Sequence, residues 1–306
     1  MKIAIMGAGG IGGFYGGRMA KAGQDVVFIA RGAHLEALRS KGLRVESQAI
    51  GDFEISTVQA TDDPGSVGAV DVVFCCVKAY GLEEAARAMA PMVGGNTVVI
   101  PLLNGVEIAE RLGAVVGMDA MLGGCAFVSA NIVEPGTIRH QAMDRLIFGE
   151  LGGGTSPRAE AVHAMLAACE IPAELSPDIR KEIWTKFVVF NAFSGACSVT
   201  RLPGKALVDD PDTRALFMDA MQEVMDLAER QGIALDSDLP AKFASMADGY
   251  PPQLKPSMLI DLEQGNRLEV ESIQGATVRL GKRLGVPTPV NRVIYAALKP
   301  HAAGAR

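Results

Sequence analysis

Apolar and polar positions alternate in blocks at the start of the chain. An apolar run at residues 2–6 leads into a glycine-rich stretch at residues 7–12, small residues fill positions 13–22, and a second apolar run covers residues 26–30. This order predicts a strand, a tight turn, a helix and a second strand. A dinucleotide-binding βαβ unit has the same order of elements.

The first half of the chain continues in this manner. Residues 71–77 and 97–102 are nearly continuous apolar runs, which are typical of parallel strands buried on both faces. Residues 82–92 between them predict a helix, and residues 156–170 predict another. Antiparallel strands at the far side of the same sheet are expected at residues 124–129, 136–141 and 145–149.

Beyond about residue 172 the pattern is almost entirely helical. Residues 178–200 are long and apolar, and residues 211–231 repeat apolar positions with the helical period. We therefore predict an α/β plus all-α protein: a Rossmann-like dinucleotide-binding domain at residues 1–172 and a helical substrate and dimerisation domain at residues 173–306. Ligand is expected between these domains, at the carboxyl ends of the parallel strands.

Composition narrows the class of protein. The 306 residues are 49% hydrophobic, which is enough for full-sized cores, and 29 basic against 35 acidic residues argue against a nucleic-acid surface. No signal peptide or membrane span is recognisable in the apolar pattern. Five cysteines without a CxxC pair indicate a reducing cytoplasm and no metal site, and four scattered histidines disfavour a histidine-based site.

The glycine-rich stretch predicts a phosphate-binding turn. Gly7 permits the tight turn, Gly9 lets the backbone approach a pyrophosphate, and Gly12 lets the helix pack close to the strand. Gly10 and Ile11 lie at the start of the helix, whose unpaired N–H groups attract phosphate. The alternative is an ordinary strand–helix loop.

The end of the second strand indicates which dinucleotide binds. An NAD-preferring unit usually carries Asp or Glu there, whereas this chain has Arg31, followed by Gly32 and His34. A guanidinium pairs with the 2′-phosphate that distinguishes NADP(H). We therefore expect NADP(H), with a solvated surface arginine as the alternative.

Four polar residues are candidates for the chemistry. Lys78 and Asn104 follow two parallel strands, where open α/β sheets bind ligand, although a snorkelling lysine and a turn asparagine would look the same. Lys186 lies in an apolar stretch. Either its aliphatic side chain simply covers apolar surface, or its ammonium group is desolvated and has a functional role. Glu269 is one of several carboxylates in the helical half, and most such groups are simply solvated.

Taken in order, these motifs resemble the ketopantoate reductases (2-dehydropantoate 2-reductases) over nearly the whole chain. The matching pieces are Gly7-Ala8-Gly9-Gly10-Ile11-Gly12, Ala30-Arg31-Gly32, Val77-Lys78-Ala79, Asn104-Gly105, Ile183-Trp184-Thr185-Lys186-Phe187, Ser257-Met258-Leu259 with Asp261, Glu269, and Gly285-Val286-Pro287-Thr288-Pro289-Val290-Asn291. The resemblance implies NADPH-dependent reduction of ketopantoate to pantoate, in pantothenate and coenzyme A biosynthesis.

The resemblance also implies roles for individual residues. Lys186 would be the general acid and Glu269 its polar partner, while Lys78 and Asn104 would line both cofactor and substrate. Further substrate contacts would come from Ser257, from Asp261 nearby, and from Ser194.

One position departs from the family pattern. Family members commonly carry Asn four and eight residues after the catalytic lysine, and this chain has Phe190 and Ser194 there. Phe190 makes the pocket more apolar, and Ser194 keeps part of a polar contact. A related 2-oxo acid reductase, a β-hydroxyacid dehydrogenase and a non-catalytic NADP-binding sensor therefore stay open as alternatives.

The methionine-rich helices after Pro211 suggest a homodimer.

Overall fold

The computed structural model describes residues 1–305 and divides into two compact units. Unit 1 comprises Met1–Leu103 and Ile108–Arg180, and unit 2 comprises Asn104–Glu107 and the chain from Lys181 onward. The sequence placed a domain boundary near residue 172. A short strand, β10 (Ala173–Leu175), pairs with the strand β9 (Thr137–Gly149) and keeps the chain in unit 1 beyond that point.

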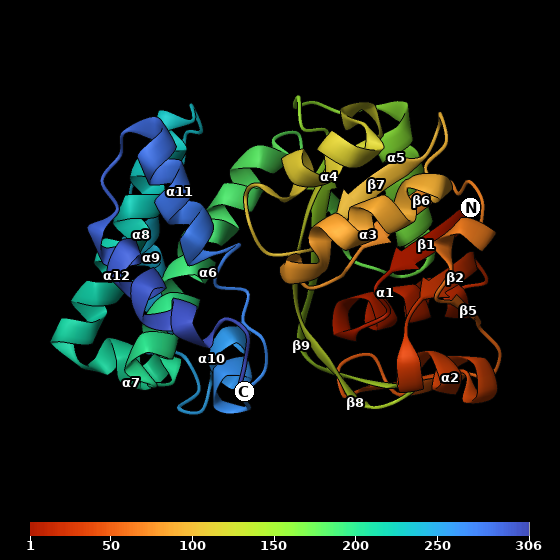
Figure 1. The fold of residues 1–306 in the computed structure, drawn as a ribbon, viewed down its shortest axis with the longest axis horizontal. Coiled ribbons are helices and arrows are strands. Elements are labelled where there is room, and N and C mark those ends of the chain that lie inside the picture. Colours follow the sequence, from red (N-terminus) through yellow and green to blue (C-terminus); the bar gives the residue numbers. More distant parts are fainter. Residues whose placement is uncertain (306) are drawn as a thin grey trace. The chain divides into compact units, whose positions relative to one another are not determined.

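Unit 1 is built around a parallel sheet, as expected. Its strand order is β5-β2-β1-β6-β7, and β1 pairs in register with β2 on one side and β6 on the other. Figure 1 shows these strands side by side in red to yellow. The strands are β1 (Lys2–Met6), β2 (Asp25–Ile29), β5 (Gln59–Thr61), β6 (Val72–Cys75) and β7 (Val98–Pro101).

The later strands of unit 1 form a second sheet, which corrects the expectation that they extend the parallel one. β9 runs through this sheet with the order β10-β9-β3-β4, and β8 pairs with it antiparallel. The expected strands at residues 136–141 and 145–149 are a single strand, β9, which continues through an irregular stretch where Met143 has a φ of +59°. The other strands are β3 (Leu43–Ser47), β4 (Phe53–Ile55) and β8 (Gly123–Glu134).

Helix α1 (Gly10–Lys21) lies between the two sheets, and its glycines permit this. A Cβ on Gly16 would lie 2.6 Å from the Phe28 ring of the parallel sheet, and one on Gly13 would lie 2.6 Å from Ile138 of the second sheet. Only a helix face without side chains can approach this closely on both sides. The remaining helices of unit 1 are α2 (Gly32–Lys41), α3 (Leu82–Met89), α4 (Ile108–Val116) and α5 (Pro157–Ala168), with short 3₁₀ turns at Pro64–Ser66, Ala79–Gly81, Ala90–Met92 and Met118–Ala120.

Both faces of the parallel sheet are buried, which explains its continuous apolar runs. On β1, Ile3 and Ile5 face the core that contains α1, whereas Ala4 and Met6 face the core formed with α3 and α4. Alternate residues of one strand therefore serve two different cores.

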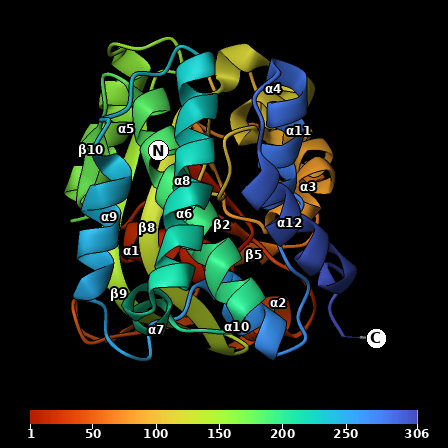
Figure 2. The ribbon, with the colours of Figure 1, turned by 90° about the vertical axis from the view of Figure 1, so that its left-hand side faces the viewer.

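Unit 2 is helical, as expected. The long helix α8 (Pro211–Arg230) begins with Asp210, whose carboxylate accepts hydrogen bonds from the N–H groups of Asp212 and Thr213. It packs against α7, α9, α11 and α12, and Figure 2 looks onto this unit. The other elements are α6 (Ile179–Thr200), α7 (Gly204–Asp209), α9 (Leu239–Asp248), α10 (Ser257–Glu263), α11 (Gln274–Leu284), α12 (Pro289–Leu298) and a 3₁₀ turn at Lys299–His301.

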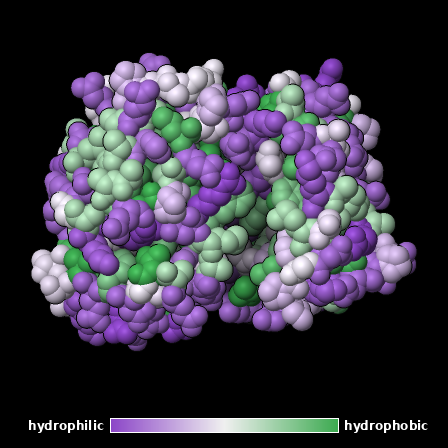
Figure 3. All heavy atoms as spheres, turned by 180° about the vertical axis from the view of Figure 1, so that it is seen from behind, coloured by the Kyte–Doolittle hydropathy of each residue, from purple (hydrophilic) through white to green (hydrophobic). Residues whose placement is uncertain are grey.

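The molecular surface in Figure 3 is mostly hydrophilic, with smaller hydrophobic patches between. Among residues 1–305, no helix is both long enough and apolar enough to cross a membrane.

Candidate functional site

The glycine-rich turn joins β1 to α1 in a closely packed conformation that favours glycine. Gly7 has a φ of +97°, a value that L side chains rarely adopt, and its N–H and that of Ala8 both donate to the Ile29 carbonyl of β2. A Cβ on Gly12 would lie 2.1 Å from the Gly7 carbonyl oxygen. By contrast, a Cβ on Gly9 would have no protein atom within 4 Å, so this side of the turn has room for a ligand.

The first turn of α1 offers donors to that space. Gly9 is the N-cap and has no side chain with which to satisfy the first N–H groups, which belong to Gly10, Ile11 and Gly12. Such N–H groups, together with the positive end of the helix dipole, bind phosphate. The turn therefore has the shape and the polarity that a pyrophosphate requires.

His34 connects the glycine-rich turn to neighbouring elements through hydrogen bonds. Its Nδ1 accepts a hydrogen bond from the N–H of Gly136 at 3.1 Å, so Nε2 carries the proton and donates to the Ala8 carbonyl at 2.8 Å. Burial lowers the pKa of His34, which agrees with a neutral ring. One imidazole thus joins the turn to α2 and to the β8–β9 hairpin.

Arg31 lies just after β2 at the start of α2. Its guanidinium is 65% exposed and forms an ion pair with Glu84 of α3, which is 63% exposed, with Nη2 at 2.7 Å from Oε1. Because exposed ion pairs contribute little, a phosphate can compete with Glu84 for this guanidinium.

Lys78 lies at the same edge of the parallel sheet as the glycine-rich turn. It follows β6, the neighbour of β1, and its side chain is exposed. The preceding residue, Val77, is in contact with the turn, since a Cβ on Gly7 would lie 2.9 Å from it. Gly7, Arg31 and Lys78 therefore all lie just past the carboxyl ends of strands in unit 1.

In unit 2, Lys186 is half-buried on α6. Its ammonium Nζ lies 5.8 Å from the centre of the Phe190 ring, one helical turn further on, within the range of a cation–π contact. Phe190 itself packs against the apolar core of the unit. The departure from the family pattern thus lies directly beside the candidate general acid.

The two polar residues that follow on α6 are turned into the core. Asn191 is fully buried, and its Nδ2 donates to Asn291 Oδ1 at 2.5 Å. Ser194 is also fully buried; its hydroxyl donates to the Asn191 carbonyl at 3.2 Å and accepts from Gln274 Nε2 at 3.3 Å. These contacts are internal to the helical core, and in this structure Ser194 has no exposed surface to offer a substrate.

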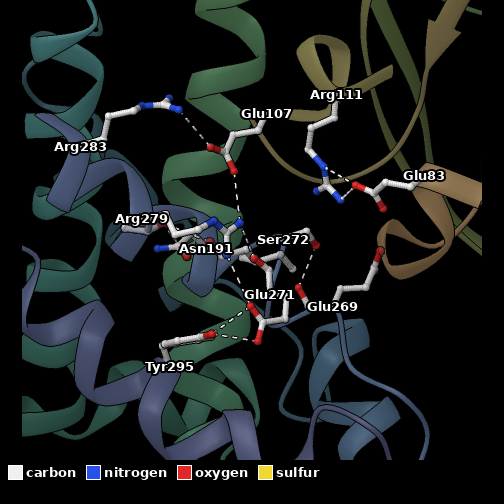
Figure 4. A network of polar contacts seen from close by, with 12 residues as sticks. Glu83, Glu107, Arg111, Asn191, Glu269, Glu271, Ser272, Arg279, Arg283 and Tyr295 are labelled. Carbon is white, nitrogen blue, oxygen red and sulfur yellow. Dashed lines mark hydrogen bonds and ion pairs between the residues drawn. The ribbon is translucent and has the colours of Figure 1, made fainter. Parts of the chain in front are cut away.

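The other candidates of unit 2 lie on α10 and in the turn after it. Ser257 is the exposed first residue of α10, and Asp261 follows one turn later, where its Oδ1 accepts from Asn266 Nδ2 at 3.3 Å. Glu269 is buried, and its backbone carbonyl accepts from the hydroxyl of Ser272 at 2.9 Å. The Glu269–Ser272 bond is drawn in Figure 4.

Asn104 follows β7 in the chain but belongs to unit 2, together with the rest of Asn104–Glu107. The segment ends in Glu107, which is bound by Arg279 of α11 through Nη2 and Oε2 at 3.2 Å. Neither Glu107 nor Arg279 belongs to a motif that the sequence shows. They are 172 positions apart, and no local pattern connects them.

Cysteine and metal chemistry find no support in the described part of the chain. All five cysteines are free, and burial raises the pKa of Cys75 and that of Cys197 to about 12. Among residues 1–305, no group of three or more His, Cys, Asp or Glu side chains is placed to hold a metal ion.

The similarity to known proteins extends over both units. The family model "Ketopantoate reductase PanE/ApbA" matches residues 3–153, and "Ketopantoate reductase PanE/ApbA C terminal" matches residues 178–302. A 2-dehydropantoate 2-reductase of Mesorhizobium japonicum is 31% identical over 320 residues, which cover 98% of this chain and 97% of that protein.

Solved structures agree with this result. A PanE/ApbA family ketopantoate reductase from Ralstonia eutropha JMP134 matches with a TM-score of 0.90 and 33% identity, over 99% of this chain and 98% of that one. D-mandelate dehydrogenase with NADH and anilino(oxo)acetate has a TM-score of 0.90 at 24% identity, over 99% of this chain and 98% of that one, and shares the fold. Because family models match both units, the chain belongs to the ketopantoate reductase family, as its ordered motifs indicated.

Proposed function

We propose that this oxidoreductase reduces ketopantoate to pantoate with NADPH. The observation that carries the proposal is the match of both units to the ketopantoate reductase family models, at residues 3–153 and 178–302. The full-length relative from Mesorhizobium japonicum carries the name of this activity.

The residues of unit 1 fit a bound NADPH. The open side of Gly9 and the first-turn N–H groups of α1 would hold the pyrophosphate, and Arg31 would bind the 2′-phosphate by displacing Glu84. Lys78 supplies a further positive charge at the same sheet edge. When bound, NADPH supplies the hydride for the carbonyl carbon of the substrate.

The protein's own residues supply the proton and stabilise the negative charge that develops during the reaction. As hydride reaches the carbonyl carbon, negative charge develops on the oxygen, and the Lys186 ammonium stabilises that charge and donates a proton. Glu269 orients the ammonium, while Asn104 and Ser257 bind the substrate with Asp261 nearby. A proton donor of this kind contributes about 10²–10⁴-fold to the rate.

A steady-state assay tests the proposal. Adding ketopantoate to purified protein and NADPH should start NADPH oxidation, and Lys186→Ala should lower kcat by about 10²–10⁴-fold with the KM for NADPH nearly unchanged. Lys282→Ala is the control, because Lys282 is an exposed lysine on α11. A near-normal kcat in Lys186→Ala contradicts the proton-donor role. NADPH binding without turnover of any 2-oxo acid would indicate a sensor instead.

A second candidate substrate class is a 2-oxo acid with an apolar side chain. It is favoured by the Phe190 ring beside Lys186, where the family pattern would supply an amide. A panel of 2-oxo acids with NADPH and NADH, and of 2-hydroxy acids with NADP⁺, separates the two classes. Turnover of apolar 2-oxo acids without turnover of ketopantoate would select the second.

The proposed setting is pantothenate and coenzyme A biosynthesis in the cytoplasm. The homodimer stays a prediction from the apolar helices of the second half, and size-exclusion chromatography with light scattering would test it.

A further inference from the structure

The segment Asn104–Glu107 contacts the rest of unit 2 through an apolar residue and through an acidic residue. Val106 packs against the helical core, and the Glu107 carboxylate, only 15% exposed, lies between two arginines of α11. Arg279 Nη2 donates to Glu107 Oε2 at 3.2 Å, whereas Arg283 Nη1 lies 3.9 Å from Oε1. Arg279 therefore makes the direct hydrogen bond, and Arg283 adds only a longer ion pair.

The same Arg279 guanidinium also binds the turn after α10. Its Nη2 donates to the Glu271 backbone carbonyl at 3.0 Å, and Nη1 lies 3.5 Å from Glu271 Oε2. Glu271 is two residues after Glu269. Figure 4 shows Arg279 between Glu107 and Glu271, so that one planar group joins the segment that carries Asn104 to the turn that carries Glu269.

The Glu271 end of this contact is itself anchored. Its two carboxylate oxygens accept from the Tyr295 hydroxyl of α12 at 2.8 and 2.9 Å. A Cβ on Gly275 would lie 3.0–3.1 Å from Tyr295, Arg279 and Glu271 alike, so the three side chains meet over a position that only glycine leaves open. Tyr295 of α12 thus anchors the turn that carries Glu271, and Arg279 connects this turn to the segment Asn104–Glu107.

We propose that Arg279 is a positioning residue that sets the spacing of Asn104 and Glu269 for the substrate. This inference rests on the proposed function, in which both residues act at the substrate. Arg279 is 50% exposed, and solvent screening on its side limits what its ion pair with the less exposed Glu107 contributes to global stability. The segment is short and contains Gly105, with its φ of +132°, so we expect the bridge to act on local order.

Arg279→Gln in the full-length protein tests the role, with Arg283→Gln as the matched control on the same helix. Arg279→Gln should lower kcat/KM for ketopantoate about threefold to tenfold, the range that one or two such pairs supply, with the KM for NADPH unchanged. Arg283→Gln should change kcat/KM less than about twofold. Arg279→Lys should lie between wild type and Arg279→Gln, since one ammonium cannot match the two-sided guanidinium.

Hydrogen exchange gives a readout that needs no turnover. Amides of residues 104–107 should exchange faster in Arg279→Gln than in Arg283→Gln, while the thermal midpoints of the two variants stay close. Glu107→Gln combined with Arg279→Gln should lose no more activity than Arg279→Gln alone, because Arg279→Gln already removes the direct hydrogen bond to Glu107.

The outcomes against the proposal are distinct from those against the proposed function. A wild-type kcat/KM in Arg279→Gln overturns the positioning role, and unchanged exchange at residues 104–107 overturns the bridge itself. Lack of ketopantoate turnover by the wild-type protein contradicts the proposed function, while the exchange comparison still decides whether Arg279 orders the segment.

Discussion

The Lys186 ammonium lies 5.8 Å from the centre of the Phe190 ring, one turn along the same helix. An aromatic face thus lies beside the candidate proton donor, at the position where the family pattern has an amide. The Phe190 ring offers no hydrogen bond to a hydroxyl-bearing substrate.

Phe190→Asn should therefore raise the preference for ketopantoate over its analogue without the hydroxyl group. The ratio of the two kcat/KM values should rise about twofold to tenfold, the worth of one neutral hydrogen bond. Phe190→Leu is the control, because it removes the ring and keeps the apolar character. An unchanged ratio in Phe190→Asn would mean that this position does not contact the substrate side chain.

Gly9 and Gly12 should respond differently to the same substitution. Gly12→Ala places a Cβ 2.1 Å from the Gly7 carbonyl and should lower the free energy of unfolding by about 1–3 kcal/mol, as overpacking does. Gly9→Ala meets no protein atom and should unfold like the wild type, yet raise the KM for NADPH. Urea unfolding and cofactor titration of both variants check this, and a normal KM for Gly9→Ala speaks against the pyrophosphate site.

Arg31→Ala should reduce the preference for NADPH over NADH by about 10–100-fold, since charge-assisted hydrogen bonds to the 2′-phosphate are lost. Glu84→Gln should act in the opposite direction and modestly lower the KM for NADPH, because it removes the competitor in the 2.7 Å ion pair. Arg87→Ala, an exposed arginine on α3, serves as the control. Equal effects on both cofactors would rule out 2′-phosphate recognition by Arg31.

His34 should make stability depend on pH. Burial holds the pKa of His34 below the value of about 6.5 that it has in the unfolded chain. As pH falls below about 6.5, the unfolded chain takes up a proton that the folded protein resists, so the free energy of unfolding should decrease until pH passes the folded pKa. Urea unfolding between about pH 7.5 and pH 5 should show a shallower decline for His34→Gln. Identical slopes for the two proteins would contradict this assignment.

The buried polar network of Asn191, Asn291 and Glu223 should be critical for stability. Glu223 is buried, and its carboxylate accepts from the N–H groups of Val290 and Asn291 and from Asn291 Nδ2 at 2.7–2.9 Å. Asn291→Ala removes one of the three hydrogen bonds to the Glu223 carboxylate and leaves Asn191 Nδ2 without the Asn291 acceptor, so it should cost about 1–3 kcal/mol of unfolding free energy. Asn266→Ala at an exposed position should stay within about 0.5 kcal/mol of wild type. A similarly small loss for Asn291→Ala would show that the network contributes little.

Local signals were sufficient where one segment determines its own conformation. The strand, glycine turn and helix from Lys2 through Gly12 follow from apolar runs and from a glycine that must take a φ of +97°. Lys78 was placed at the correct sheet edge because strand ends are readable from the sequence. The substitution at Phe190 was visible because it lies a fixed helical turn from Lys186.

Long-range pairing was not readable in this way. The strands that pair as β8 and β9 were expected, but their membership in a second sheet depends on a partner near residue 45, and local alternation does not specify a distant partner. The sequence did not predict that Asn191 and Ser194 form hydrogen bonds with Asn291 and Gln274 in the core, because these partners lie on other helices.

By itself, the sequence determined the order of elements, the glycine-rich turn, Arg31 after the second strand and the family, because these depend on neighbouring residues or on motifs in a fixed order. Only the tertiary structure decided that His34 holds the turn through Ala8, and that Arg279 joins Glu107 to Glu271. Such contacts join side chains brought together by the packing of separate elements, and a hydrogen bond depends on distances that a linear pattern does not contain.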